Sequence, residues 1–249
     1  MKANIEIETA TFRIDLEQPI SLALPIQATP EAASAWYCGP TQITPVMTEQ
    51  FTGSVALGGA VNFRDVQFNP HGNGTHTECV GHISKEFYSI HQVLKRFFFL
   101  AQLWTVTPEI QENDRIITLA QIQTALSKQA HLEALVIRTN PNSNQKKQRQ
   151  YSNTNPTYME AAAAAWLYDQ GIRHILIDTP SVDREEDDGI LAAHHAFWNY
   201  PMAPRLDATI TELIYAPNNV KDGLYILNLQ VAAFENDATP SQPTLYALL

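Results

Sequence analysis

The segment from His71 to His82 constrains this chain more than any other part of the sequence. It reads His-Gly-Asn-Gly-Thr-His-Thr-Glu-Cys-Val-Gly-His and places three imidazoles and one carboxylate within twelve residues. Burying so many polar side chains in one place costs free energy unless a cation holds them together. The segment therefore predicts a fold that gathers these side chains around a divalent metal ion. Histidines that belong only to the surface or the core are the alternative.

The spacing within this segment suggests how the side chains meet. His76 and Glu78 would lie on one side of an extended segment, because strand side chains repeat every two residues. His82 could return to the same place through a turn at Gly81, and the Gly-Asn-Gly sequence after His71 lets the backbone bend sharply. Imidazole and carboxylate together suit zinc, manganese or iron.

A second group of polar side chains lies far downstream. His194 and His195 stand in the otherwise apolar run 191–198, and Glu212 stands in the apolar run 208–214. A carboxylate in such a run is costly to bury unless it is paired or bound to a metal. A glutamate at a strand end, half exposed, is the alternative.

Composition and charge restrict the class of protein. The chain has 249 residues, of which 45% are hydrophobic and 17% charged, as in an ordinary globular protein, and we expect one domain over 1–249. A formal net charge of -10 argues against nucleic acid or an anionic membrane surface as a partner. Residues 1–18 lack the apolar core of a secretory signal, and the most apolar run, 97–104, is too short to span a bilayer. Two cysteines are too few for a disulfide framework, and a cytoplasmic protein of the size of an enzyme is expected.

Short strands dominate the first third of the chain. Residues 4–8 and 61–68 read as strands, the latter half-buried because its apolar residues alternate. Residues 97–106 are aromatic and β-branched, which predicts a buried strand.

Helices and strands alternate from about residue 118. Thr118 is predicted to cap a helix, and 132–139 follows as a buried strand. Residues 158–170 contain five consecutive alanines and predict a helix that ends at Gly171, before a strand over 172–177. This order predicts an α/β or mixed fold.

The stretch 140–156 between these elements is polar and turn-rich. It contains three basic residues, which we interpret as part of a solvated loop rather than a phosphate site. A long loop in a compact domain can also cover an active site.

Other chemistries find no support. The acidic run 183–189 lacks the glycine and glutamate that a calcium-binding EF-hand loop requires at its sixth and twelfth positions. No glycine-rich phosphate loop occurs, and no Gly-x-Ser-x-Gly nucleophile motif is present. Cys79 would point away from Glu78 on a strand, so we interpret it as a packing residue rather than a nucleophile.

Taken in order, these motifs resemble the metal-dependent cyclase/arylformamidase family, which includes bacterial kynurenine formamidases and isatin hydrolases. Residues 74–82 resemble its Gly-Thr-His-x-Asp-x-Pro-x-His signature, and 171–183 its Gly-…-Asp-Thr-x-Ser-x-Asp segment. Three shorter matches follow at 194–198, 211–213 and 236–240.

The chain departs from the family signature at three positions. Glu78 replaces the usual aspartate, and Val80 replaces the usual proline. The first histidine, His71, lies five residues before His76 instead of four, so either a one-residue bulge restores it to the metal or that ligand is lost. We expect the bulge.

The resemblance implies a swivelling β/β/α fold with a mixed central sheet, commonly oligomeric, with subunits sharing the active-site entrance. It implies one or two divalent ions, zinc or manganese, with Glu78 as a possible bridge. The implied ligands are His71, His76, Glu78, His194 and Glu212. His82 would be the proton shuttle, and His195 is the alternative to His194. Asp183 would orient a ligand.

The implied activity is hydrolysis of an amide-type bond, a formamide or cyclic amide on an aromatic substrate. Trp36, Tyr37 and Phe87 are candidates for an aromatic pocket, although a core position is the simpler expectation for each. Two alternatives stay open: a lactone or imide hydrolase on the same scaffold, and a catalytically silent member that binds a small ligand or partner.

Overall fold

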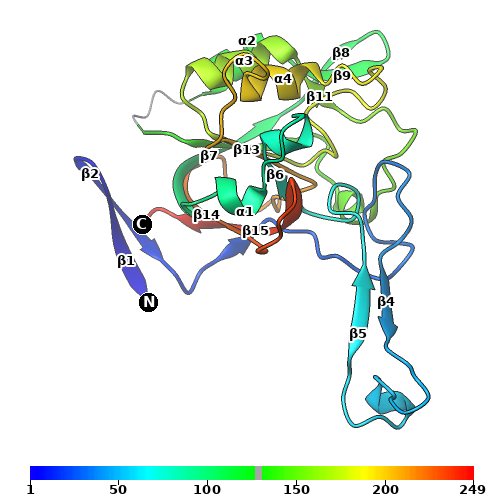
Figure 1. Ribbon diagram of the computed structural model, residues 1–249. Coiled ribbons are helices and arrows are strands. Elements are labelled where there is room, and N and C mark those ends of the chain that lie inside the picture. Colours follow the sequence, from blue (N-terminus) through cyan, green and yellow to red (C-terminus); the bar gives the residue numbers. More distant parts are fainter. Residues whose placement is uncertain (127–130) are drawn as a thin grey trace.

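A closed sheet forms the centre of the computed structural model, which describes residues 1–126 and 131–249. Seven strands close into a barrel in the order β14-β7-β10-β12-β13-β6-β15, with β15 paired back to β14 (Figure 1). They are β6 (His76–Glu78), β7 (Phe98–Val106), β10 (Ala134–Thr139), β12 (His174–Ile177), β13 (Thr209–Glu212), β14 (Gly223–Val231) and β15 (Ala238–Ala247). Strands β7, β10, β12 and β13 are parallel neighbours and the other pairings are antiparallel. The predicted α/β fold with a mixed central sheet is confirmed, whereas closure of that sheet was not predicted.

Strand β10 shows why the barrel buries both of its faces. All six residues of the strand are buried. Leu135 and Ile137 belong to a cluster that they share with the helices, whereas Ala134 and Val136 belong to a second apolar cluster with residues of the other strands. Because strand side chains alternate, a strand covered on both faces reads as a continuous apolar run.

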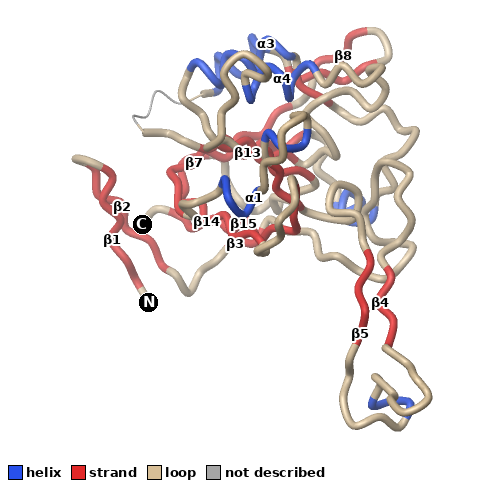
Figure 2. Tube along the Cα trace, viewed as in Figure 1, coloured by secondary structure: helices blue, strands red, loops and turns tan. Residues whose placement is uncertain are grey.

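Three helices pack together on one side of the barrel, α2 (Leu119–Ala125), α3 (Ala161–Asp169) and α4 (Ala192–Trp198), as Figures 1 and 2 show. Thr118 caps α2 as predicted, since its side chain accepts a hydrogen bond from the backbone N–H of Gln121. Gly171 follows α3 with φ of 80°, the left-handed conformation expected of a helix end. The helix predicted from residue 158 begins only at Ala161, because Tyr158–Met159 forms the short strand β11.

The remaining elements lie around the barrel. They are α1 (Ile90–Val93), the hairpin β1 (Lys2–Ile7) and β2 (Ala10–Asp15), the edge strand β3 (Ile20–Ser21), the strands β8 (Glu109–Gln111) and β9 (Asp114–Ile117), and 3-10 helices at Val80–His82 and Asn144–Gln148. No helix of the described residues is long and apolar enough to cross a membrane.

An arm made by residues 42–67 extends away from the barrel (Figure 1). It consists of β4 (Gln42–Pro45) paired with β5 (Arg64–Gln67) and a loop with a 3-10 helix at Val55–Leu57. The prediction of a half-buried strand over 61–68 is wrong, because β5 is shorter and all four of its residues are exposed. The apolar alternation is real, but neither face of the arm packs on the core.

The interpretation of 140–156 as a solvated loop is also wrong in one respect. Lys146 is buried, and its ammonium group donates to Asp178 Oδ2 at 2.7 Å and to the Thr139 carbonyl at 2.6 Å. The loop is therefore anchored to the ends of β10 and β12.

Candidate metal centre

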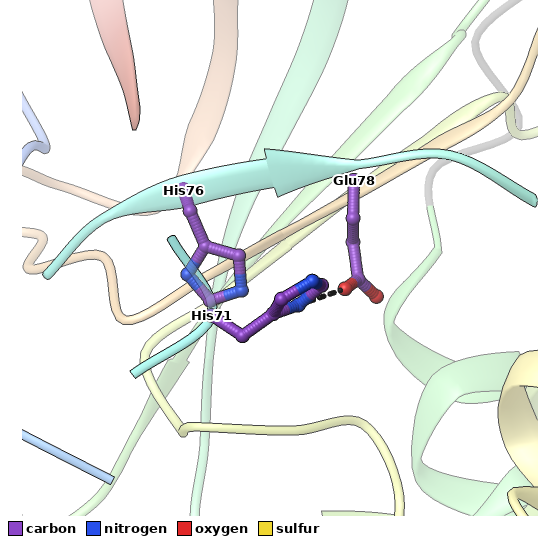
Figure 3. A group of neighbouring side chains, drawn as sticks. All are labelled: His71, His76 and Glu78. Carbon is purple, nitrogen blue, oxygen red and sulfur yellow. Dashed lines mark ion pairs between the residues drawn. The ribbon is translucent and has the colours of Figure 1, made fainter. Parts of the chain in front are cut away.

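Two neighbouring strands place three of the expected ligands on one face of the sheet. His76 and Glu78 lie at the two ends of β6 and project to the same side, as Figure 3 shows. Glu212, at the end of β13, pairs directly with His76 in the antiparallel ladder. Directly opposed residues of such a ladder project from the same face, and Glu212 Oε2 lies 3.4 Å from His76 Nε2.

The displaced histidine also reaches this face. His71 Nδ1 lies 3.0 Å from Glu78 Oε2 (Figure 3). Between His71 and Glu78 the backbone makes a turn at Gly74. This residue has φ of 108°, a conformation that favours glycine. The local backbone thus brings His71 to the cluster despite the extra residue before His76, and its role as a metal ligand stays a prediction.

His82 approaches the cluster through the 3-10 helix that follows β6. Its Nδ1 lies 3.9 Å from Glu78 Oε2, and its ring is 4.4 Å from the ring of His71 between centroids. A β-carbon at Gly81 would overlap the carbonyl oxygen of Tyr88, so the turn requires glycine. The predicted turn at Gly81 is therefore confirmed.

Helix α4 contributes His194, which is buried. Its Nε2 lies 2.9 Å from Glu78 Oε1, and its Nδ1 lies 2.5 Å from Asp183 Oδ2. Asp183 also accepts hydrogen bonds from the backbone N–H groups of Ala193 and His194 in the first turn of the helix. A carboxylate behind an imidazole in this way fixes the tautomer that points the other nitrogen at a metal.

His195 does not join the cluster. Its Nδ1 lies 3.0 Å from the carbonyl oxygen of Tyr200, to which it can donate. Of the two neighbouring histidines, the structure thus places His194, the expected ligand, in the cluster with Glu78. Cys79 is buried in an apolar cluster, where burial raises the pKa of its thiol to about 12, as suits a packing residue.

Buried polar atoms without a hydrogen bond show what this cluster lacks. His76 Nδ1 lies 3.1 Å from the carbonyl oxygen of Gly74, which leaves the lone pair on Nε2 facing the other side chains. Within the described part of the chain, neither His76 Nε2 nor Glu78 Oε2 has a hydrogen-bond partner that meets normal geometry. A bound cation would satisfy both atoms, and imidazole and carboxylate groups are the ligands that zinc and manganese accept.

Charge in the cluster is unevenly distributed. Burial would lower the pKa of His194, but hydrogen bonds to Asp183 and Glu78 outweigh it and raise that pKa to about 10. Burial opposes ionisation of Glu78, yet the surrounding histidines hold its pKa well below the usual range. Burial and the charge of Glu78 raise the pKa of Glu212. A divalent cation would allow both carboxylates to be ionised together.

Asp237 is a site residue that we did not predict. Its Oδ2 lies 2.9 Å from His71 Nε2 and 3.4 Å from His82 Nδ1. Hydrogen bonds and charge interactions with these two histidines hold its pKa below the ordinary aspartate value in spite of burial. Its only sequence signal was membership of the C-terminal motif at 236–240.

Exposure gives the cluster a closed side and an open side. His76, Glu78, His194 and Glu212 are at most 3% exposed. The side chains of His71, His82 and Asp237 are 21–29% exposed. All of these residues except Glu212 belong to three overlapping groups that could each hold a metal ion: His71, His76 and Glu78; His71, His82 and Asp237; Glu78, His82 and His194.

The aromatic candidates are placed differently from expectation. Tyr37 and Phe87 are 64% and 69% exposed, so a core position is wrong for both. Trp36 is half-buried against Tyr151 and Leu213, and Leu213 directly follows Glu212.

A comparison with known families decides where the chain belongs. The model of the family described as "Putative cyclase" matches residues 14–184. The chain belongs to this cyclase family. A search of the curated proteins finds no match.

Solved structures of other cyclase-like proteins share the fold. A predicted metal-dependent hydrolase from Bacillus stearothermophilus is 17% identical, with a TM-score of 0.62 over 92% of this chain and 98% of that one. Isatin hydrolase A from Labrenzia aggregata, bound to benzyl benzoate, is 12% identical, with a TM-score of 0.67 over 93% and 94%. An isatin hydrolase bound to the product analogue thioisatinate is 12% identical, with a TM-score of 0.65 over 93% of each chain. At these identities the likeness concerns the fold.

Proposed function

We propose that this cyclase-family protein is a metal-dependent hydrolase that cleaves an amide-type bond, a formamide or a cyclic amide. The observation that carries the proposal is the buried Nε2 lone pair of His76, which faces the carboxylates of Glu78 and Glu212 and lacks a hydrogen-bond partner among the described residues. The names of two similar folds, a metal-dependent hydrolase and an isatin hydrolase, support the same class of reaction.

The proposed metal ligands are the five that the sequence suggests, His71, His76, Glu78, His194 and Glu212. The ion is zinc or manganese, because both accept imidazole and carboxylate ligands. A second ion would use the open side, where His71, His82 and Asp237 also lie within ligand distance of one another.

The residues on the open side handle the substrate. When bound, a divalent ion lowers the pKa of a water toward about 7 and polarises the carbonyl group under attack. His82 is partly exposed and lies beside Glu78 and Asp237, so it can take up a proton and return it to the departing nitrogen. Asp237 orients His71 and His82 by accepting from both imidazoles.

A catalytically silent member and a lactone or imide hydrolase are the alternatives. The departures from the family signature at Glu78 and His71 favour a silent member, yet both side chains reach the cluster, and His71 Nδ1 lies 3.0 Å from Glu78 Oε2. This contact supports a working site. A lactone or imide hydrolase would use the same groups, so only substrate preference separates it from an amide hydrolase.

We also propose a homo-oligomer. Apolar side chains on the arm at 42–67 are exposed, among them Leu57 at 65% and Phe63 at 59%. A two-stranded ribbon has little stability in water by itself, and contact with a second copy of the chain would cover this surface.

Metal content per chain, measured by elemental analysis on protein purified without chelator, tests the function. We expect one to two equivalents of zinc or manganese, reduced in Glu212→Gln and unchanged in the control Glu49→Gln, whose side chain is exposed. Metal-loaded protein should then hydrolyse members of a panel of aryl formamides, cyclic amides and lactones. Protein that takes up neither zinc nor manganese would overturn the proposal in favour of a ligand-binding role.

A further inference from the structure

A polar cavity lies at the ends of β10 and β12. Its volume is about 480 Å³. Thr139, at the carboxyl end of β10, and Asp178, which follows β12, form its floor with Lys146. None of the four histidines and three carboxylates of the candidate metal centre lines this cavity: His71, His76, Glu78, His82, His194, Glu212 and Asp237. Ligands of α/β proteins commonly bind at the carboxyl ends of parallel strands.

The charge of this cavity is opposite to that of the chain. The chain carries 26 acidic and 16 basic residues, yet the cavity is lined by three basic residues, Arg115, Lys146 and Arg149, and by one acidic residue, Asp178. The ammonium group of Lys146 pairs with Asp178 and is also satisfied by Thr139. Two positive charges therefore remain on the walls.

Those two charges belong to guanidinium groups that no carboxylate neutralises. Among the described residues, no salt bridge involves Arg115 or Arg149. Arg115 donates one hydrogen bond, from Nη2 to the Asn155 carbonyl oxygen at 3.2 Å. A guanidinium has five N–H donors in a fork that matches carboxylate and phosphate oxygens, so most donors remain for a ligand.

The surroundings hold Arg149 at the cavity wall. Its guanidinium carbon lies 5.1 Å from the centre of the Tyr151 ring, and Tyr151 is buried. The Tyr151 hydroxyl reaches the carbonyl oxygen of Asp178 at 3.4 Å. A cation stacked on a buried ring loses less side-chain freedom when it binds an anion.

The basic residues also repel one another. Burial lowers the pKa of Lys146 although Asp178 opposes this shift, and the positive charge of Arg149 lowers it further. An anion between these groups would relieve the repulsion. Polar side chains of Ser143, Gln145 and Gln148 line the same cavity and can donate to it.

We propose that this cavity binds a small oxyanion, a phosphate or a carboxylate, held by Arg149 and Arg115. Bidentate contacts of arginine with such groups are among the stronger hydrogen bonds in proteins. No proposed metal ligand lines the cavity, so this proposal does not rest on the metal centre or on the reaction proposed there.

Isothermal titration of the full chain with inorganic phosphate, and separately with acetate, tests this proposal. We expect saturable binding of at least one anion. Loss of one charged hydrogen-bond partner weakens binding by about tenfold or more, so Arg149→Gln and Arg115→Gln should show this loss. Arg149→Lys should retain part of the affinity because it keeps the charge. Arg13→Gln, an exposed arginine on β2, is the matched control and should bind as the parent does.

A repeat of the titrations with EDTA separates this cavity from the metal centre. Binding that persists with EDTA and falls in the arginine variants supports the proposal, whichever anion binds better. Binding that disappears with EDTA and ignores both arginine substitutions belongs to a bound metal and overturns it. Absence of binding of both anions to a folded parent, checked by circular dichroism, also overturns it.

Discussion

Asp183 Oδ2 accepts from the backbone N–H of His194 at 3.0 Å and lies 2.5 Å from Nδ1 of the same residue. One carboxylate thus accepts a hydrogen bond from the first turn of helix α4 and also fixes the orientation of the His194 ring in the cluster. Because Nδ1 is occupied, Nε2 is left to face Glu78 at 2.9 Å. The position of a proposed ligand is therefore set by a residue that does not itself reach the cluster.

Asp183→Asn should lower metal affinity by about 10- to 100-fold, the usual effect of losing the partner behind a metal-binding histidine. An amide holds the imidazole ring less strongly than a carboxylate. Competition with a chromophoric zinc chelator gives the affinity, and Asp188→Asn, an exposed change in the same loop, is the control. Equal affinities for the parent and Asp183→Asn would show that the pairing does not support the metal.

Gly81→Ala should destabilise the protein by about 1–3 kcal/mol, the cost of forcing an extra carbon into a packed site. The new β-carbon would overlap the Tyr88 carbonyl oxygen, so the turn that carries His82 must shift. Urea unfolding measures the loss of stability. Gly39→Ala, where nothing lies within 4 Å of the added carbon, should be nearly neutral. A similar midpoint for both variants would contradict the close approach.

His174 should make the protein less stable in mild acid. Burial lowers the pKa of this histidine from 6.5 to about 3, and the positive charge of nearby arginines is a smaller contribution in the same direction. Between these two values the unfolded chain binds a proton that the folded chain does not, so stability falls as the pH decreases from 6.5. The contribution is at most about 1.4 kcal/mol per pH unit.

The measurement for His174 is urea unfolding at pH 7.5, 6 and 5 on the parent and on His174→Gln. The variant loses packing against Phe99 and should be less stable at pH 7.5. Its deficit should shrink as the pH falls, because it lacks the titrating group. The exposed His91→Gln is the control, and a deficit that stays constant with pH would exclude the proposed role of His174.

The parts of the fold that were predicted correctly depend on local signals. Five alanines and a following glycine define α3 and its end, and Thr118 with Gln121 defines the start of α2. Closure of the barrel depends on pairing between β14 and β15, which leaves no local trace in the sequence. The alternation of Val61, Phe63 and Val66 is the same whether a strand faces the core or solvent, so the exposed arm was misread.

The site shows the same limit. The spacing of His76, Glu78 and His82 was sufficient to place them together, because they share one short segment. Asp237 meets His71 across 166 residues, and only the tertiary fold creates that contact. Composition likewise indicated a solvated loop for 140–156. Lys146 in this loop is nevertheless buried, and its charge is compensated by an ion pair with Asp178.

Lys146→Gln should destabilise the protein by about 3–5 kcal/mol, as expected when one partner of a buried ion pair is removed. The ammonium group donates to Asp178 and Thr139, and burial already raises the pKa of Asp178. The neighbouring exposed Lys147→Gln is the control. Adding Asp178→Asn to Lys146→Gln should recover part of the loss, because no unpaired charge then remains. An additive loss in the double variant would mean that the pair does not act as a unit.

The arm at 42–67 should control self-association. Leu57 and Val61 are 65% and 51% exposed, and the double change Leu57→Glu with Val61→Glu places two charges on this apolar surface. Burying unpaired charges in an interface costs several kcal/mol, so the variant should sediment as a smaller species than the parent in analytical ultracentrifugation. Ile110→Glu, a charge placed on a 79% exposed residue of β8, is the matched control and should leave the oligomer intact. If the parent is a monomer, or if the arm variant assembles as the parent does, contact between copies does not cover this surface.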